Sequence, residues 1–243
     1  MSTGSRRFDA VIFDLDGTLL VDDHHMAVLE TCDELARAHP EIDVGALEAA
    51  NSVAWDEAWS ALGDDWMLGK LPNSRMLSET VWSTALADLG IVDPAIVEEA
   101  LQRHVQAEIR HLHLTEGAVE LLDAAHAAGA KLAVITNGAV DVQTNKLRDT
   151  GILDRFDVVT TSGSAGVMKP DSRIFLLTLE ALGVAAGRAV HIGDNLVNDV
   201  GGTKGAGLTA VWLNVNGNGG GQATEPVPDY DVRSLTVIPA LLF

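Results

Sequence analysis

The hydrophobic pattern divides the chain into an N-terminal strand, a helical middle region and a C-terminal region where helices and strands alternate. Residues 8–13 form a short apolar, β-branched run, which predicts a buried strand. From about residue 22 to residue 111, apolar residues recur three and four positions apart, which predicts helices and no convincing strand. The alternation after residue 114 is typical of a parallel sheet covered by helices on both faces.

This periodicity predicts a set of elements and from them a fold. In the middle region we expect helices over residues 26–39, 44–62, 74–89 and 95–109, with breaks near Pro40, Gly63, Pro72 and Pro94. Beyond it we expect helices over 118–128, 139–150, 172–182, 196–206 and 235–242, and strands over 131–135, 157–160, 189–192, 209–213 and 230–232. The expected fold is α/β: a Rossmann-like parallel sheet from residues 1–20 and 114–243, with an inserted α-helical subdomain over 21–113.

Composition and charge narrow the range of partners. The chain has 243 residues, 47% of them hydrophobic, which is enough for a sizeable core. Sixteen Lys and Arg against 35 Asp and Glu give a net charge of −19, which argues against a nucleic-acid partner, because such proteins neutralise phosphates with clustered cations. Eighteen acidic and five basic residues lie between residues 21 and 113, so the insertion carries −13 of this charge.

The sequence lacks the patterns typical of exported or membrane-spanning chains. No apolar stretch approaches the ~20 residues that span a bilayer, and residues 1–7 contain no apolar signal core, so we expect a cytoplasmic protein without a membrane partner. The single cysteine, Cys32, excludes an internal disulfide framework, and its helical spacing favours a buried apolar position. The glycine- and asparagine-rich run over 216–221 is interpreted as a flexible surface loop.

Polar residues follow the predicted strands of the sheet. In chain order they are Asp14 and Asp16, then Thr136, Asn137 and Gly138, then Lys169, and finally Asp194, Asn195 and Asp199. The carboxyl ends of parallel strands meet at one crevice, so we expect these side chains to converge. Carboxylates gathered in this way repel one another unless a cation lies among them. Aspartate oxygens without nearby His or Cys are hard ligands, which indicates Mg²⁺.

These motifs resemble those of the haloacid dehalogenase superfamily, in the branch whose α-helical cap is inserted between the first and second motifs. They are the run from Asp14 to Thr18, Thr136-Asn137-Gly138, Lys169-Pro170 and the run from Gly193 to Asp199. The resemblance covers residues 11–213, although the cap matches only in position and helical character. It implies hydrolysis of a small-molecule phosphate monoester through an aspartyl-phosphate intermediate, with Mg²⁺ as cofactor.

The resemblance also implies a role for each motif residue. Asp14 would be the nucleophile and Asp16 the general acid and base. Thr136, Asn137, Gly138 and Lys169 would bind the substrate phosphate, and Thr136 and Lys169 would also take part in catalysis. Asp14, Asp194 and the carbonyl of Asp16 would bind the metal, while Asn195 and Asp199 would orient these ligands. For Asn195, capping of the next helix is an equal alternative.

The sequence does not exclude the other activities of the superfamily. Asp16 argues against a dehalogenase, because halide leaves without a proton. Lys70, the one lysine of the insertion, would have to form the Schiff base of a phosphonatase, and the charge of −13 argues against a phosphosugar mutase. A non-catalytic binding module is the alternative from a different class. We expect a monomer or homodimer that acts on a small phosphorylated metabolite such as a nucleoside monophosphate or sugar phosphate.

Several residues of the insertion have both a structural and a functional interpretation. Trp55 and Trp59 lie one helical turn apart and either fill the core of the helical bundle or form a stacking wall for a substrate. His24 and His25 follow the first motif closely and are either surface residues or catalytic groups. Lys70 and Arg75 either lie at exposed helix ends or contact a substrate oxygen.

Overall fold

The computed structural model describes residues 8–217 and 225–243 and divides the chain into two compact units. The core unit comprises Met1–Val21 and His113–Phe243, and the insertion unit comprises Asp22–Leu112. The two segments that join the units form short paired strands, β2 (Leu20–Asp22) and β3 (Leu112–Leu114). The sequence did not predict these two strands. Residues 218–221 of the expected glycine-rich loop lie outside the described residues.

The core unit is built on a six-stranded sheet with the strand order β5-β4-β1-β6-β7-β8. Its strands are β1 (Ala10–Phe13), β4 (Lys131–Thr136), β5 (Val158–Thr161), β6 (Ala189–Gly193), β7 (Thr209–Leu213) and β8 (Tyr230–Val232). All neighbouring strands are parallel, which confirms the predicted sheet. Strands β4 and β5 extend the sheet on one side of β1 and β6, β7 and β8 on the other. A ligand crevice is therefore expected beyond the carboxyl end of β1.

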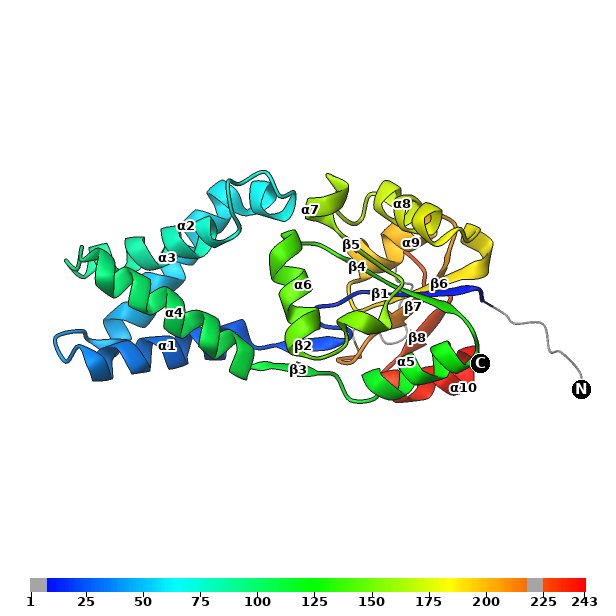
Figure 1. Ribbon diagram of the computed structural model, residues 1–243, viewed down its shortest axis with the longest axis horizontal. Coiled ribbons are helices and arrows are strands. Elements are labelled where there is room, and N and C mark those ends of the chain that lie inside the picture. Colours follow the sequence, from blue (N-terminus) through cyan, green and yellow to red (C-terminus); the bar gives the residue numbers. More distant parts are fainter. Residues whose placement is uncertain (1–7, 218–224) are drawn as a thin grey trace, which may run out of the picture. The chain divides into compact units, whose positions relative to one another are not determined.

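Helices cover both faces of this sheet (Figure 1). Helices α5 (Ala118–Ala127) and α10 (Ile238–Leu242) lie on one face, and α8 (Ser172–Leu182) and α9 (Gly202–Gly205) lie on the other. Phe175 and Leu179 of α8 pack against Ile12 of β1 and Ala133 of β4. Phe175 and Ile12 are fully buried, and burial of each such side chain contributes about 1.5–3 kcal/mol. This packing fixes the sheet whose ends carry the candidate site.

The other helical segments of the core unit lie in the connections between strands or after the last strand. They are α6 (Val140–Asp149), the 3₁₀ turns η1 (Leu153–Arg155), η2 (Ala186–Arg188) and η4 (Leu235–Val237), α7 (Ser162–Ala165) and the π-helical turn η3 (Leu196–Gly201). The helix predicted over 196–206 is therefore a π turn followed by α9. The hydrophobic spacing does not distinguish a π turn from an α turn, and π turns are frequent at functional sites.

The insertion unit consists of four helices. They are α1 (His24–Ala38), α2 (Val44–Met67), α3 (Arg75–Asp88) and α4 (Pro94–Arg110). Helix α1 packs against α4 and α2 packs against α3. Leu35, Leu47, Trp82 and Leu86 belong to one buried cluster between the helices. The side chains of Asp23, Asp43 and Asp93 cap the amino ends of α1, α2 and α4, which satisfies backbone N–H groups that have no partner within the helix.

Helix α2 continues to Met67 although the sequence predicted a break near Gly63, so that prediction was wrong. Glycine in a helix costs about 1 kcal/mol relative to alanine, but here the missing side chain makes room for a ring. A Cβ atom at Gly63 would lie 3.0 Å from the Trp59 indole. The Trp59 ring in turn stacks on Trp55, with centroids 5.6 Å apart, and both pack against the buried cluster. The tryptophans therefore fill the bundle.

Two predictions from composition concern the membrane and the cysteine. No helix in the described ranges is long and apolar enough to cross a bilayer. Cys32 is buried, as predicted, and burial together with the nearby Glu48 carboxylate raises the pKa of its thiol to about 12. The thiol is therefore protonated and part of the apolar interior of the bundle.

Candidate active site

Asp14 lies at the carboxyl end of the central strand β1, where the backbone is fixed between neighbouring strands. Its N–H donates to the carbonyl of Ile192 over 2.9 Å. The carboxylate is 7% exposed, and its Oδ1 accepts a hydrogen bond of 2.6 Å from Lys169 Nζ. Burial and the neighbouring Asp199 carboxylate raise the pKa of Asp14, and Lys169 opposes that shift.

Lys169 is a buried cation held between two carboxylates. Its Nζ lies 2.6 Å from Asp14 Oδ1 and 2.7 Å from Asp199 Oδ1. Burial alone would lower the pKa of this lysine, but the two carboxylates outweigh that effect and raise it above its usual range. The side chain of Asn137 fixes the Lys169 backbone, since Nδ2 donates to the lysine carbonyl over 3.1 Å and Oδ1 accepts from its N–H over 2.8 Å.

Three carboxylates gather at this end of the sheet. Oxygens of Asp14, Asp194 and Asp199 lie within 4.8 Å of one another. Glycines make this approach feasible, because a Cβ atom at Gly17 would lie 2.6 Å from Asp194 Oδ2. Burial and the Asp199 carboxylate raise the pKa of Asp194. One lysine does not neutralise three carboxylates, and clustered hard oxygen donors are the ligand set that a divalent cation such as Mg²⁺ prefers.

Asp199 is placed by the π turn that follows β6. The N–H of Asn195 donates to Asp199 Oδ2 over 2.9 Å, while the Asn195 side chain accepts hydrogen bonds from the N–H groups of Val197 and Asn198. Asn195 therefore combines the two interpretations that the sequence left open, because its side chain caps the turn and its backbone orients a carboxylate.

Asp16 lies two residues beyond Asp14 and makes a different set of contacts. Its carboxylate accepts hydrogen bonds from Gln143 Nε2 over 2.7 Å and from Lys146 Nζ over 2.8 Å. The same Gln143 Nε2 donates to the buried hydroxyl of Thr136 over 2.5 Å. Gln143 thus links the first and second motifs. Sequence reasoning missed Gln143 and Lys146, and the available signal was their spacing of three residues on the helix that follows β4.

The remaining candidate phosphate ligand is the backbone of Gly138. Its N–H donates to Ser162 Oγ over 2.8 Å, so binding of a phosphate there would require this hydrogen bond to be exchanged or shared. Ser162 is the first residue of α7, a helix that the sequence did not predict. Phosphate binding by Gly138 stays a prediction.

Two basic residues of the insertion unit, Lys70 and Arg75, lie in exposed ion pairs. Lys70 lies 3.6 Å from Asp65, and Arg75 pairs with Glu79 and Glu98. Both side chains are about half exposed, which fits their interpretation as exposed helix ends.

Comparisons with known proteins agree with this arrangement. A family model described as haloacid dehalogenase-like hydrolase matches residues 8–207. The chain is 35% identical to a phosphoserine phosphatase of Thermus thermophilus over 84% of this chain and 87% of that protein. It is 29% identical to pyrimidine 5'-nucleotidase YjjG of Escherichia coli, with 97% and 98% covered. A solved HAD phosphatase from Thermococcus onnurineus is 30% identical, with a TM-score of 0.66 and coverage of 96% and 97%. The chain belongs to the haloacid dehalogenase-like hydrolase family.

Proposed function

We propose that this chain hydrolyses small-molecule phosphate monoesters, with Asp14 as the nucleophile. The observation that carries the proposal is the buried Asp14 carboxylate with Lys169 Nζ at 2.6 Å and two further carboxylates beside it. Three buried or half-buried carboxylates with one lysine to offset their charge serve no packing purpose. The relatives reported above are named phosphatases and a nucleotidase, which supports phosphoryl transfer as the reaction class.

Hydrolysis would take two steps on the residues of this chain. In the first, an Asp14 oxygen bonds to phosphorus, the bond from phosphorus to the leaving oxygen breaks, and Asp16 gives that oxygen a proton. In the second, Asp16 takes a proton from water, the water oxygen bonds to phosphorus, and the bond to Asp14 breaks. Lys169 and the Thr136 hydroxyl hold the phosphate oxygens during both steps. Gln143 and Lys146 orient the Asp16 carboxylate through hydrogen bonds of 2.7 and 2.8 Å.

The three-carboxylate cluster fits Mg²⁺ as the cofactor. Asp14 and Asp194, with the carbonyl of Asp16, would hold the ion, and Asp199 and Asn195 would keep these ligands in place. When bound, the ion neutralises charge on the transferring phosphoryl group. Lys169 already offsets part of the cluster's charge, which leaves a net negative site for the divalent cation.

The proposal assigns a different role to each of the two units. Residues 1–20 and 114–243 would form the catalytic core, and residues 21–113 the cap that selects the leaving group. A cap of charge −13 favours monophosphates with neutral, sugar-like or nucleoside-like leaving groups.

Phosphate release from a chromogenic ester in the presence of Mg²⁺ tests the proposal. Asp14→Asn should lower kcat by about 10³-fold or more, since the amide keeps the shape and loses the nucleophile. Asp171→Asn is the matched control, because Asp171 only caps α8 and pairs with Arg173 at the surface. Substantial activity in Asp14→Asn would remove Asp14 from the nucleophile role. Absence of phosphate release by the unaltered chain across a set of phosphorylated metabolites would contradict phosphatase activity itself.

A further inference from the structure

A second cluster of metal-ligating side chains lies within the insertion unit. His24 is in the first turn of α1, and His104 and Glu108 lie one turn apart near the end of α4. One ligand atom from each of the three lies within 4.8 Å of the others. His24 Nδ1 and His104 Nε2 are each 3.5 Å from the same oxygen, Glu108 Oε1. His104 is 3% exposed, whereas the side chains of His24 and Glu108 are 37% and 43% exposed, so the cluster lies at the edge of the bundle interior.

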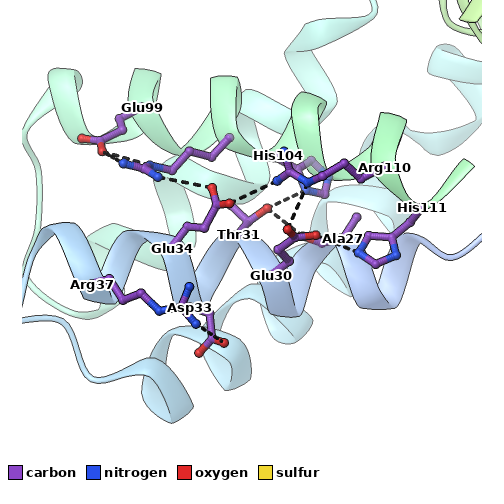
Figure 2. Close-up of polar contacts among 11 residues, drawn as sticks. Ala27, Glu30, Thr31, Asp33, Glu34, Arg37, Glu99, His104, Arg110 and His111 are labelled. Atoms are coloured by element: carbon purple, nitrogen blue, oxygen red, sulfur yellow. Dashed lines mark hydrogen bonds and ion pairs between the residues drawn. The ribbon is translucent and has the colours of Figure 1, made fainter.

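The two distances of 3.5 Å are longer than those of two other histidine–glutamate pairs in the same bundle, while a third pair, His39 Nδ1 and Glu41 Oε1, is 3.8 Å apart. His111 Nε2 lies 2.8 Å from Glu30 Oε2 (Figure 2), and His39 Nε2 lies 2.9 Å from Glu99 Oε2. Those two pairs have the length of charge-assisted hydrogen bonds, ~2.7–2.9 Å. Ligands placed 2.0–2.1 Å from a tetrahedral zinc ion lie about 3.4 Å apart. The spacing in the cluster therefore matches the edge of a coordination tetrahedron better than it matches a hydrogen bond.

Contacts on the far side of the His104 ring fix its orientation. The hydroxyl of Thr31 donates to the carbonyl of Ala27 over 2.7 Å, so its oxygen is left to accept from His104 Nδ1 at 3.4 Å (Figure 2). With Nδ1 turned toward Thr31, Nε2 is the ring nitrogen that faces Glu108 Oε1. A hydrogen bond at the second ring nitrogen is also common in metal-bound histidines.

A buried polar group beside the cluster also lacks a partner. Asn51, from α2, is 3% exposed, and its Nδ2 makes no hydrogen bond to any described residue. It lines the same small cavity as His24 and His104. An unpaired buried donor costs about 1–3 kcal/mol. A zinc site with three protein ligands keeps its fourth position for a water or another oxygen ligand, and Asn51 Nδ2 is a donor without a partner among the described residues in the cavity that His24 and His104 line.

We propose that His24 Nδ1, His104 Nε2 and Glu108 Oε1 bind a divalent transition metal ion in the insertion unit. Two imidazoles and one carboxylate favour Zn²⁺, in contrast to the all-oxygen cluster at the end of β1. The ion would tie the first turn of α1 to the last turn of α4. The site does not depend on the proposed phosphatase activity.

Titration of the metal-free full-length protein with Zn²⁺ and Co²⁺ tests this site. Four-coordinate Co²⁺ with imidazole ligands absorbs visible light strongly, whereas six-coordinate Co²⁺ on carboxylates and water absorbs weakly, so the spectrum separates the two clusters. We expect the strong spectrum in the unaltered protein, and a Zn²⁺ affinity measured by calorimetry that falls about 100-fold or more in His24→Gln and in Glu108→Gln.

Two control variants should keep the strong cobalt spectrum. His25→Gln changes the exposed neighbour of His24, and Asp194→Asn changes the acidic cluster of the core unit. Both ligand substitutions affect partly exposed side chains, and circular dichroism checks that the helices remain. The proposal is overturned if the unaltered protein lacks the strong cobalt spectrum, or if His24→Gln and Glu108→Gln bind Zn²⁺ as tightly as His25→Gln does.

Discussion

At the scale of single residues, the site depends on how buried charges balance one another. Lys169 contacts Asp14 and Asp199 at 2.6 and 2.7 Å, and each of the three side chains is at least nine-tenths buried. Removing one partner of a buried ion pair leaves an uncompensated charge. The arrangement therefore keeps Lys169 protonated, and it keeps a carboxylate of raised pKa, Asp14, at the position where the substrate phosphate would bind.

The proposed acid role of Asp16 predicts a dependence on the leaving group. Asp16→Asn removes the proton donor but keeps the hydrogen-bonding side chains of Gln143 and Lys146 around it. Turnover of an alkyl phosphate should fall about 10²–10⁴-fold. A nitrophenyl ester should lose much less, because nitrophenolate leaves without a proton. Comparing kcat for the two substrates is the measurement, and equal losses on both would contradict an acid role for Asp16.

His191 predicts a pH dependence of stability. It lies on β6 against Phe175, with ring centroids 5.1 Å apart, and its Nε2 bonds to no described residue. Burial lowers its pKa from 6.5 to about 3, with Asp199 and Lys169 acting in opposite directions on the imidazole. Between these two values the unfolded chain binds a proton that the folded chain does not. The contribution of His191 to the free energy of unfolding is therefore lost as the pH falls below about 6.5.

Urea unfolding at pH 7 and pH 5 measures this effect. Over that interval the unaltered protein should lose about 2 kcal/mol more stability than His191→Leu, since one pKa unit corresponds to about 1.4 kcal/mol. Carboxylates titrate in both proteins and cancel in the comparison. The same loss in both proteins would show that His191 is not the acid-sensitive group.

At the scale of elements, helical periodicity and short apolar runs predicted most of the fold. Residues 172–182 and 209–213 form a helix and a strand with the predicted bounds, because their patterns are long or strongly apolar. The strand pair β2 and β3, helix α7 and the π turn were not predicted, since none of these short segments carries a helical period or a continuous apolar run. Strand β8, which also has three residues, was predicted. Gly63 was misread as a helix break, although Trp59, one turn earlier on the same helix, has a ring that needs its space.

The packing around Trp59 predicts that replacing two glycines of α2 by alanine changes the thermal stability in opposite directions. Gly63→Ala places a methyl group 3.0 Å from the Trp59 ring, which packs among Trp55, Trp66 and the buried cluster. Gly45→Ala meets only Asp43 Oδ1, at 3.7 Å. The gain in helix propensity is about 1 kcal/mol at either position. We expect thermal unfolding to show a higher Tm for Gly45→Ala and a lower Tm for Gly63→Ala. A higher Tm for both would show that the Trp59 ring moves aside at little cost.

At the scale of the whole molecule, the motif residues were easier to predict than the side chains that form hydrogen bonds with them. Asp14 and Asp194 directly follow β1 and β6, and Lys169 follows β5 after the short helix α7, so the order of the strands brings the three together. Gln143, Lys146 and Ser162 lie on helices, where a partner depends on which face meets the site. The cluster of His24, His104 and Glu108 was missed for the same reason, since its members lie on two helices.

The charge of the insertion predicts the choice of substrate. A net charge of −13 between residues 21 and 113 should disfavour leaving groups that carry further negative charge. The effect should weaken with salt, because exposed charges are screened over about 8 Å at physiological ionic strength. We expect kcat/KM for a nucleoside monophosphate and a hexose monophosphate to exceed that for a hexose bisphosphate, most clearly at low salt. Preference for the bisphosphate at low salt would contradict this assignment.

The most direct test of the account is to locate the phosphoryl group during turnover. The protein is mixed with an excess of a phosphate monoester and Mg²⁺, quenched in acid, digested and examined by mass spectrometry. We predict one phosphoryl group on the peptide that carries Asp14, and none on that peptide in Asp14→Asn. A phosphoryl group on a different side chain, or phosphate release by Asp14→Asn at the rate of the unaltered protein, would contradict Asp14 as the nucleophile.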